Sequence, residues 1–380
     1  MKLHPAWLAS ALFALSITGA PALCGQSAAL GSESKPLDAL AANLALPFAS
    51  DLTGARRAPV FAWIEDEAGS RNIWVAGPDA PEHARTTYTG DDGVELSEPQ
   101  LSQDGRRLLF VRGGDAEYPE GSSPNTGIAL ETPEQTLFVA DVAGSQAPVK
   151  IGLGHGAAFS QDGGQVAYTR KGEIWLWSGS AAPRRLATVA GTLSDIQWSP
   201  DDHQLLFSEQ RKGHSFIGLL DIGQQALRYL GPTLGQSSDP IFSPDGRQVA
   251  FIQFRDPPAD LPDSSASFWS VRVVDVASGA VRTIWSAPGG EGGRFAGTRG
   301  RNLFWTASGH LLFPWERTGW MHIYALSAAP QSTPRDLTPD ANEVETFTPT
   351  PDGKAIVYAA NAGNLDTRQL WRAGIAGGKP

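Results

Sequence analysis

The stretch FSPDGRQVAFIQF, from Phe242 to Phe254, predicts two strands joined by a tight turn. Ser can cap the first position of a type I turn, Pro presets φ at the second, and Gly takes the left-handed position that closes the turn. The strand that follows is rich in residues that suit a buried sheet. The same pattern recurs in LSQDGRRLLFV at Leu101, FSQDGGQVAYT at Phe159, WSPDDHQLLFS at Trp198 and TPTPDGKAIVY at Thr348, and more weakly in WTASGHLLFPW at Trp305.

The spacing of these copies indicates a repeat architecture. Their unbroken intervals are roughly 40–45 residues, which is the period of a four-stranded propeller blade. A third strand follows each hairpin, as in VRVVDVASG at Val271, and a fourth usually comes next, as in AVRTIWS at Ala280. With a degenerate first unit from Pro59, there are seven units. The sequence therefore predicts an all-β fold, a seven-bladed β-propeller of four-stranded antiparallel blades. Two separate β-sandwiches are the alternative, but they require the turn motif to recur by chance.

Composition agrees with this fold and excludes one class of partner. Hydrophobic residues make up 41% of the chain, which is enough for a large core, and 42 Gly with 28 Pro fit many turns between short strands. The formal net charge is -10, and the Lys and Arg residues are scattered along the chain, singly or in pairs. Since no basic stripe can follow a phosphate backbone, nucleic acid is not an expected partner.

The first residues predict export. Lys2 precedes an apolar run from Ala6 to about Ala20, and Ala20-Pro21-Ala22 fits a signal-peptidase site. We expect a signal peptide at 1–22, a flexible lead-in at 23–50 and the propeller at 51–380, in a periplasmic or secreted protein. Nothing after residue 22 is long enough to span a membrane.

The only cysteine, Cys24, follows Pro21 and Leu23, where a bacterial lipoprotein signal has Leu and a small residue, so lipidation is not expected. One cysteine gives no internal disulfide and supports no metal site.

The last unit lacks one element of the repeat. Its hairpin and its third strand, QLWRAGIAGG from Gln369, are present, and a fourth strand is due next. Either residues near Leu46 to Leu52 return to complete this blade, or the polypeptide has been cut short within it.

The repeats resemble those of the Tol-type and dipeptidyl peptidase-type propellers. The segment LFPWERTGWMHIYAL and the sequence RDLTPDANEVETFTPTPDGKAIVYAANAGNLDTRQLWRAGIAGGKP are similar to the end of the amino-terminal propeller of bacterial serine peptidases of the prolyl oligopeptidase family. The resemblance covers roughly Pro59 to Pro380. It implies a peptidase lineage in which an α/β-hydrolase domain with the Ser, Asp and His of the triad follows the propeller.

The chemistry of that family is absent from this sequence. No G-x-S-x-G nucleophile elbow occurs in the chain, so we expect no catalytic residue and no peptidase activity from these residues alone. The resemblance implies a non-catalytic propeller that gates or docks a peptide or protein substrate beside a hydrolase domain. The alternative is a free-standing Tol-like propeller that binds an envelope protein. A propeller enzyme with a site in its channel lacks a convergent acid-base set.

The loops between the second and third strands of each blade should emerge on one face, opposite the SPDG-type turns. Charges and two long insertions, 113–134 and 254–267, fall there, and functional loops gather on one rim of a rigid scaffold. The face is therefore a candidate surface for a substrate or partner, although these loops can also be simply solvated hairpin ends.

The most specific candidates for a binding site on that face are Glu316 and Arg317, which lie between Trp315 and Trp320 in the sequence. A carboxylate and a guanidinium beside aromatic rings can bind the amine and the carboxylate of a peptide. They can equally pair with each other across the hairpin. The paired-glutamate signature that such peptidases use for a substrate amino terminus is not evident.

The remaining signals favour structural roles. The seven histidines have no paired metal spacing, so no metal or other cofactor is expected, and His155 in GLGHGAAF fits a role bonded to the backbone. Most tryptophans fall at strand positions, where packing between blades is the expected role.

Overall fold

The computed structural model describes residues 40–43, 45–78, 80–119, 132–179, 181–255, 268–290, 292–298, 300–329 and 332–378. The predicted signal peptide, Cys24 and most of the predicted lead-in lie outside these residues, as do most of the two long insertions. A short helical segment occupies 40–43 and belongs to a unit, 1–46, that is separate from the propeller unit, 47–380.

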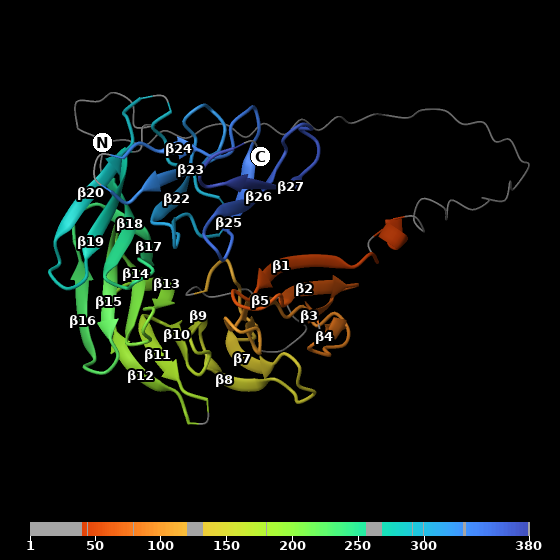
Figure 1. The fold of residues 1–380 in the computed structure, drawn as a ribbon. Coiled ribbons are helices and arrows are strands. Elements are labelled where there is room, and N and C mark those ends of the chain that lie inside the picture. The colour runs from red at the N-terminus through yellow and green to blue at the C-terminus, as the bar shows by residue number, and fades with distance from the viewer. Residues whose placement is uncertain are drawn as a thin grey trace, which may run out of the picture. The chain divides into compact units, whose positions relative to one another are not determined.

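The propeller unit contains seven antiparallel sheets arranged as blades in a ring (Figure 1). The first three blades contain β1 (Phe48–Gly54), β2 (Phe61–Glu67), β3 (Ser70–Gly77) and β4 (Ala80–Ala84), then β5 (Leu96–Leu101), β6 (Arg107–Arg112), β7 (Thr136–Asp141) and β8 (Val149–Leu153), then β9 (His155–Phe159), β10 (Val166–Arg170), β11 (Glu173–Trp177) and β12 (Arg184–Thr188). The next two contain β13 (Thr192–Trp198), β14 (Gln204–Arg211), β15 (His214–Asp221) and β16 (Ala226–Leu230), then β17 (Gln236–Phe242), β18 (Gln248–Arg255), β19 (Phe268–Asp275) and β20 (Val281–Ser286). The last two contain β21 (Phe304–Trp305), β22 (His310–Trp315), β23 (His322–Ser327) and β24 (Arg335–Asp336), then β25 (Val344–Pro349), β26 (Ala355–Ala360) and β27 (Gln369–Gly374).

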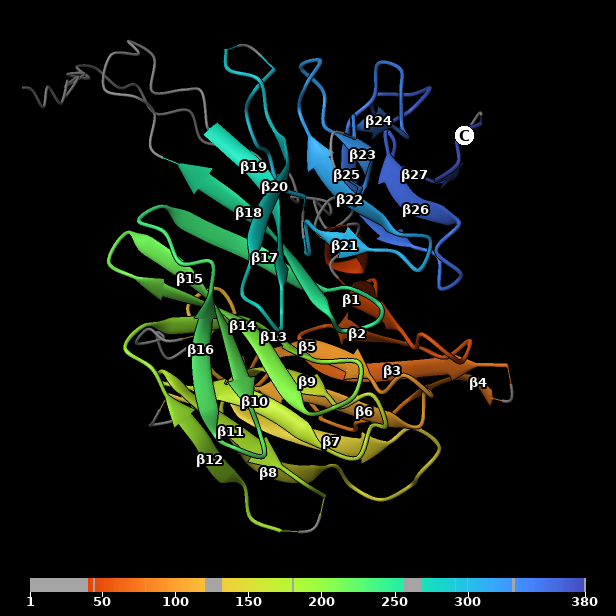
Figure 2. The ribbon, with the colours of Figure 1, turned by 60° about the vertical axis from the view of Figure 1, so that its left-hand side comes forward.

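The predicted seven-bladed fold is confirmed, and the last blade has three strands. Each blade is a contiguous piece of chain, with its first strand innermost and its last strand outermost. The inner strands of the first six blades lie beside one another in sequence order, so β13 neighbours both β9 and β17 (Figure 2).

The recurring turn has the predicted geometry. In the fifth blade the N–H of Gly246 donates to the carbonyl of Ser243 at 2.9 Å, and Gly246 has a φ of 70°. The Ser243 hydroxyl donates to Asp245 at 2.6 Å and accepts from the N–H of Gln248 at 2.9 Å. The Asp of the motif therefore stabilises the turn together with Ser, Pro and Gly, and its carboxylate has a lowered pKa because Ser243 donates to it.

Burial between neighbouring blades forms the core. The largest cluster joins the fifth and sixth blades, where Trp269 is 2% exposed and packs edge-on against Trp285 and Phe313, with ring centroids 4.9 and 5.5 Å away. The Nε1 of Trp269 donates to the carbonyl of Gly293 at 3.0 Å, which satisfies its buried polar atom. The packing interpretation of the tryptophans is confirmed at this interface.

The N-terminal segment does not complete the last blade. Strand β1 pairs with β2 and forms the inner strand of the first blade, so of the two alternatives for the last blade, the return of residues near Leu46 to Leu52 is wrong. The hydrophobic pattern of this segment fits either position, and pairing with the adjacent strand closes a much shorter loop. Strand β1 also begins at Phe48, three residues before the expected propeller boundary at 51.

We predict that Trp269→Ala lowers the free energy of unfolding by about 3–5 kcal/mol, because it leaves a cavity between two blades. Leu234→Ala is the control, since Leu234 is 83% exposed and its truncation is expected to change stability by less than about 0.5 kcal/mol. Urea-induced unfolding measures both values. A loss for Trp269→Ala no larger than that for the control would contradict this assignment of the core.

Candidate functional site

The loops between the second and third strands share one face of the ring. Strand direction alternates within each blade, and the inner strands are equivalent from blade to blade, so these loops emerge opposite the Ser-Asp-Gly turns. Their described residues are 68–69, 113–119 with 132–135, 171–172, 212–213, 316–321 and 361–368, and residues 256–267, between β18 and β19, lie outside the described part of the chain. We call this surface the loop face.

The four residues predicted as a binding site lie at the loop of the sixth blade. Trp315 ends β22 and is 2% exposed, with its Nε1 donating to the carbonyl of Gly292 at 2.8 Å. The Arg317 guanidinium carbon lies 5.3 Å from the centre of the Trp315 ring, a cation-π contact, and Arg317 is exposed. Glu316 and Trp320 are half-buried.

The four residues differ in how far solvent can reach their side chains. Trp315 belongs to the aromatic core, and its ring contacts the guanidinium of Arg317. The side chains that solvent can reach are Arg317 and parts of Glu316 and Trp320. Within the described residues, Glu316 and Arg317 form no ion pair with each other. Binding at these residues stays a prediction.

A second group of charged residues was missed by the sequence reasoning. Inner strands of several blades contain a β-bulge, and in four of them the residue at the bulge is acidic and has a left-handed backbone conformation: Asp51, Glu98, Asp195 and Asp239, with φ of 52°, 52°, 57° and 52°. Each follows a serine, in Ser50-Asp51, Ser97-Glu98, Ser194-Asp195 and Ser238-Asp239. A serine followed by an acidic residue, a few positions before the turn motif, is the sequence pattern from which these bulges could have been predicted. We call these four residues the acidic ring.

The acidic ring connects neighbouring blades near the centre of the propeller. Glu98 accepts a hydrogen bond from the N–H of Gly156, in the next blade, at 2.7 Å. Asp239 accepts from the N–H of Asn302, at the start of the next blade, at 2.9 Å. The left-handed conformation costs each residue on the order of 1 kcal/mol, and at Glu98 and Asp239 these charge-assisted bonds offset that cost.

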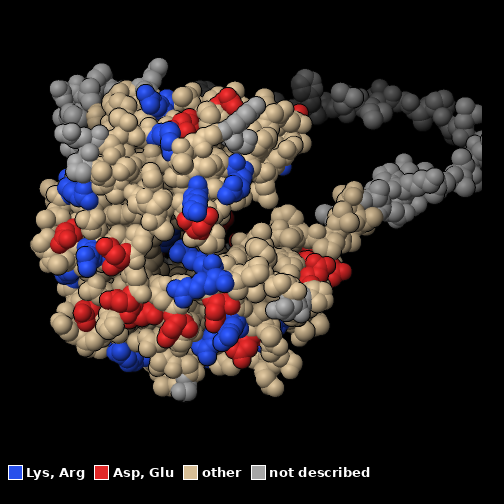
Figure 3. All heavy atoms as spheres, in the orientation of Figure 1, with Lys and Arg blue, Asp and Glu red and all other residues tan. Residues whose placement is uncertain are grey.

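Desolvation shifts the titration of two ring members. Surrounding protein raises the pKa of Glu98, and the bond from Gly156 only partly opposes that shift. Desolvation likewise raises the pKa of Asp239, against the bond from Asn302. Arg301 lies close to Asp195 and Asp239, and its own pKa is lowered by desolvation. Figure 3 shows acidic and basic side chains bordering a hollow at the centre of the ring.

Two members of the acidic ring also line a cavity at the loop face. The cavity has a volume of about 780 Å³ and lies between the first and second blades. Its charged lining consists of Asp51, Asp66, Arg71, Glu95, Glu98, Asp115 and Glu117, and its apolar lining includes Phe48, Ile64 and Leu96. Arg71 is its single cation and pairs with Asp66 at 3.2 Å. The cavity therefore has an excess of negative charge beside apolar surface, which suits a cationic ligand. We call it the acidic cavity.

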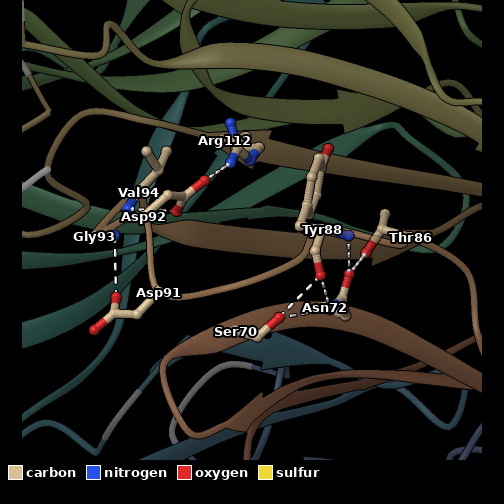
Figure 4. A network of polar contacts seen from close by, with 9 residues as sticks. All are labelled: Ser70, Asn72, Thr86, Tyr88, Asp91, Asp92, Gly93, Val94 and Arg112. Atoms are coloured by element: carbon tan, nitrogen blue, oxygen red, sulfur yellow. Dashed lines mark hydrogen bonds and ion pairs between the residues drawn. The ribbon is translucent and has the colours of Figure 1, made fainter. Parts of the chain in front are cut away.

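A polar network fixes the loop that leads into this cavity (Figure 4). Asn72 accepts from the N–H of Tyr88 at 2.7 Å and donates to the Tyr88 carbonyl at 3.0 Å. Arg112 forms an ion pair with Asp92 and lies over the Tyr88 ring, 4.1 Å from its centre. The next residues include Glu95, whose carboxylate accepts from the N–H of Ala116 at 3.2 Å. Bonds from Asn72 in the first blade and Arg112 in the second therefore hold the connection that carries Glu95 to the acidic cavity.

The other polar candidates serve the fold. His155 is 6% exposed, and its backbone carbonyl accepts from the Thr169 hydroxyl at 3.0 Å, as expected for a structural role. Among the residues that the structure describes, no group of three or more His, Cys, Asp or Glu is placed to hold a metal ion. In the same residues, no helix is long and apolar enough to cross a bilayer.

Comparisons with known proteins identify the fold. No protein-family model matches the sequence. Among solved structures, the chain is similar to one reported for two prolyl endopeptidases, with a TM-score of 0.63 and 15% identity over 90% of this chain and 51% of that chain. It is also similar to dipeptidyl peptidase 4 from Porphyromonas gingivalis, with a TM-score of 0.57 and 12% identity over 90% of this chain and 54% of that chain.

These likenesses confirm the predicted resemblance at the level of the fold. The chain spans about half the length of each peptidase chain. A putative TolB from Agrobacterium tumefaciens also matches, with 16% identity over 64% of this chain and 82% of that chain, but its TM-score is only 0.39. The class that the structure defines is a seven-bladed β-propeller with the fold found in prolyl peptidase chains.

We predict that Glu98→Gln stabilises the protein above about pH 5, and that the gain grows with pH. A raised pKa in the folded state means that the Glu98 carboxyl favours folding below its unfolded pKa and loses that contribution as pH rises through the folded pKa. The Gln oxygen can still accept from Gly156 and never becomes charged. Unfolding free energies of both proteins between about pH 4 and pH 8 measure the difference. A difference that is flat with pH, or a less stable variant at pH 7, would contradict this role of desolvation.

Proposed function

We propose that this chain is an exported, non-catalytic propeller of the prolyl oligopeptidase lineage, which docks a polypeptide on its loop face and controls access to a hydrolase domain. The observation that carries the proposal is the match of 90% of the chain to about half of a prolyl endopeptidase, at a TM-score of 0.63. A propeller beside a peptidase active site has one evident use, which is to select the polypeptides that reach it.

The charges of the loop face suggest which polypeptides bind. The acidic cavity offers carboxylates around an apolar floor, so it favours a segment with a positive charge, such as an amino terminus or a basic side chain. On the sixth blade, Arg317 can receive a carboxylate as a bidentate partner, with Glu316 and Trp320 beside it. A docked peptide would thus meet opposite charges at two parts of the face.

The site of action that we propose rests on the first residues. The sequence 1–22 has the features of a signal peptide and supports export to the periplasm or the medium. An interaction module of the cell envelope is the second candidate function. The acidic cavity fits it as well, because its excess of negative charge suits a basic segment of a partner protein as much as one of a substrate.

We predict that a basic extended peptide binds the loop face and that Glu117→Gln weakens it about threefold, the usual worth of one accessible charge pair. The matched control is Glu82→Gln, which removes the same charge from the exposed outer strand β4. Fluorescence anisotropy measures the affinities, and added salt should weaken binding to the unaltered protein. Equal losses for the two variants would contradict a role of the acidic cavity.

We predict that the purified chain neither cleaves chromogenic dipeptide substrates nor reacts with a fluorophosphonate. The physical reason is that no serine in the sequence occupies a G-x-S-x-G elbow with a base and an oxyanion hole around it. Substrate cleavage together with covalent labelling would show that the propeller carries its own nucleophile and would overturn the non-catalytic assignment.

A further inference from the structure

Two neighbouring blades present the same Arg-Lys-Gly sequence on the loop face. The hairpin between β10 and β11 turns at residues 170–172, and the hairpin between β14 and β15 turns at residues 211–213. The third and fourth blades, which contain these hairpins, pack side by side in the ring (Figure 1). Both hairpins join the second strand of a blade to the third, so the two turns occupy equivalent positions. We call the turns, 171–172 and 212–213, the lysine tips.

Each lysine tip has an unfavourable residue at its first position. Only two residues, Lys and Gly, separate the paired strands in each hairpin. The φ angle is 49° at Lys171 and 40° at Lys212, and the Gly that follows each of them also has a positive φ. Positive φ at both central residues defines a type I′ turn, which favours Asn-Gly, Asp-Gly or Gly-Gly. Asn and Asp suit it because their polar atoms can bond to the nearby backbone, whereas Lys has no polar atom close to its own backbone.

The first blade has the same turn without the charge. Its two turn residues, Ala68 and Gly69, also lie between directly paired strands, and their φ angles are 51° and 85°. Because the turn forms there without a cation, the fold gives no reason for a lysine at this position in two other blades. Backbone strain that the fold does not require is a sign of a functional constraint.

The lysine tips are accessible and positively charged. Lys171 and Lys212 are both exposed. The carboxylates nearest to them in the sequence are Glu173 and Glu209, and each of these forms an ion pair with an arginine. Glu209 is also fully buried. The charge of both carboxylates is therefore balanced within the protein, and this part of the loop face keeps a net positive charge.

The first two blades carry the opposite charge on the same face. Glu65, Asp66 and Glu67 precede the turn of the first blade, and the acidic cavity continues this charge into the second blade. These carboxylates would be repelled by an anionic membrane, and neither lysine tip has an apolar side chain that could insert into lipid. A polypeptide can present acidic and basic groups at separate positions, so it fits a face with two charges better than a membrane does.

We propose that Lys171 and Lys212 form a binding site for an acidic segment of the polypeptide that docks on the loop face. A carboxylate of the segment would lie at each lysine tip, and the two lysines would select the segment by its charge. This site deepens the proposed function and rests on it, because it binds the acidic part of a polypeptide whose basic part enters the acidic cavity.

The test uses the full chain and two capped peptides that alternate Ser with either Glu or Gln. The Glu peptide should bind more tightly than the Gln peptide, and added salt should weaken its binding. Replacing both lysines, by Lys171→Asn and Lys212→Asn, should weaken the Glu peptide about tenfold, or about threefold for each accessible charge pair. The same variant should have a higher unfolding midpoint in urea, because Asn suits a type I′ turn better than Lys does. Weaker binding by a more stable protein cannot result from misfolding.

Two control variants separate the charge of the lysines from the turn that carries it. Ala68→Asn makes the same change of turn in the first blade, so it should raise the unfolding midpoint and leave the affinity for the Glu peptide unchanged. Lys171→Arg with Lys212→Arg keeps both charges, so it should bind the Glu peptide within about twofold of the unaltered chain.

Equal affinities for the Glu and Gln peptides would overturn the proposal. An Asn variant that binds the Glu peptide as tightly as the unaltered chain would do the same. Lysine-dependent binding to vesicles of phosphatidylcholine and phosphatidylglycerol in equal parts, without binding of the Glu peptide, would also overturn it and would show a membrane to be the occupant.

The basic peptide that tests the acidic cavity distinguishes failure of this site from failure of the proposed function. If the basic peptide binds through Glu117 and the Glu peptide does not bind, the lysine site is wrong and the proposed function stands. If neither peptide binds, both are wrong. If the Glu peptide binds through the lysines and the basic peptide does not bind, the lysine site stands and the role of the acidic cavity is wrong.

Discussion

A four-stranded blade cannot bury both of its faces alone, and the rest of this structure depends on that constraint. Each blade is apolar on the side that meets the next blade, so the core is a series of interfaces rather than one centre. The Ser-Asp-Gly turn sets the pairing of the first two strands in register, and register decides which side chains reach the interface. A large ring such as Trp269 is therefore buried by a blade other than its own.

The turn motif was visible in the sequence because it is local. Ser243, Asp245 and Gly246 form their bonds within five residues, so their spacing predicts their geometry. The acidic ring was harder to predict, since the partners of Glu98 and Asp239 are 58 and 63 residues away and belong to the next blade. A repeated dipeptide of Ser with Asp or Glu indicates a bulge, but only the position of the next blade shows which group the carboxylate bonds.

The structure divides the predicted site into one buried and three accessible residues, and the sequence alone does not predict that division. The four predicted residues, Trp315, Glu316, Arg317 and Trp320, differ in exposure because β22 ends at Trp315. The side chain that ends the strand points into the interface with the fifth blade, while the residues beyond it follow the loop. The prediction of the loop itself needed only the order of strands, whereas the orientation of each side chain depended on the neighbouring blade.

The centre of the propeller shows what a carboxylate costs near other protein atoms. Such a group is costly unless a backbone N–H satisfies it, so Glu98 and Asp239 serve as links between blades. The pKa of each is nevertheless raised, because desolvation outweighs the bond from the next blade. The same carboxylates therefore join the blades and make the stability of those links depend on pH.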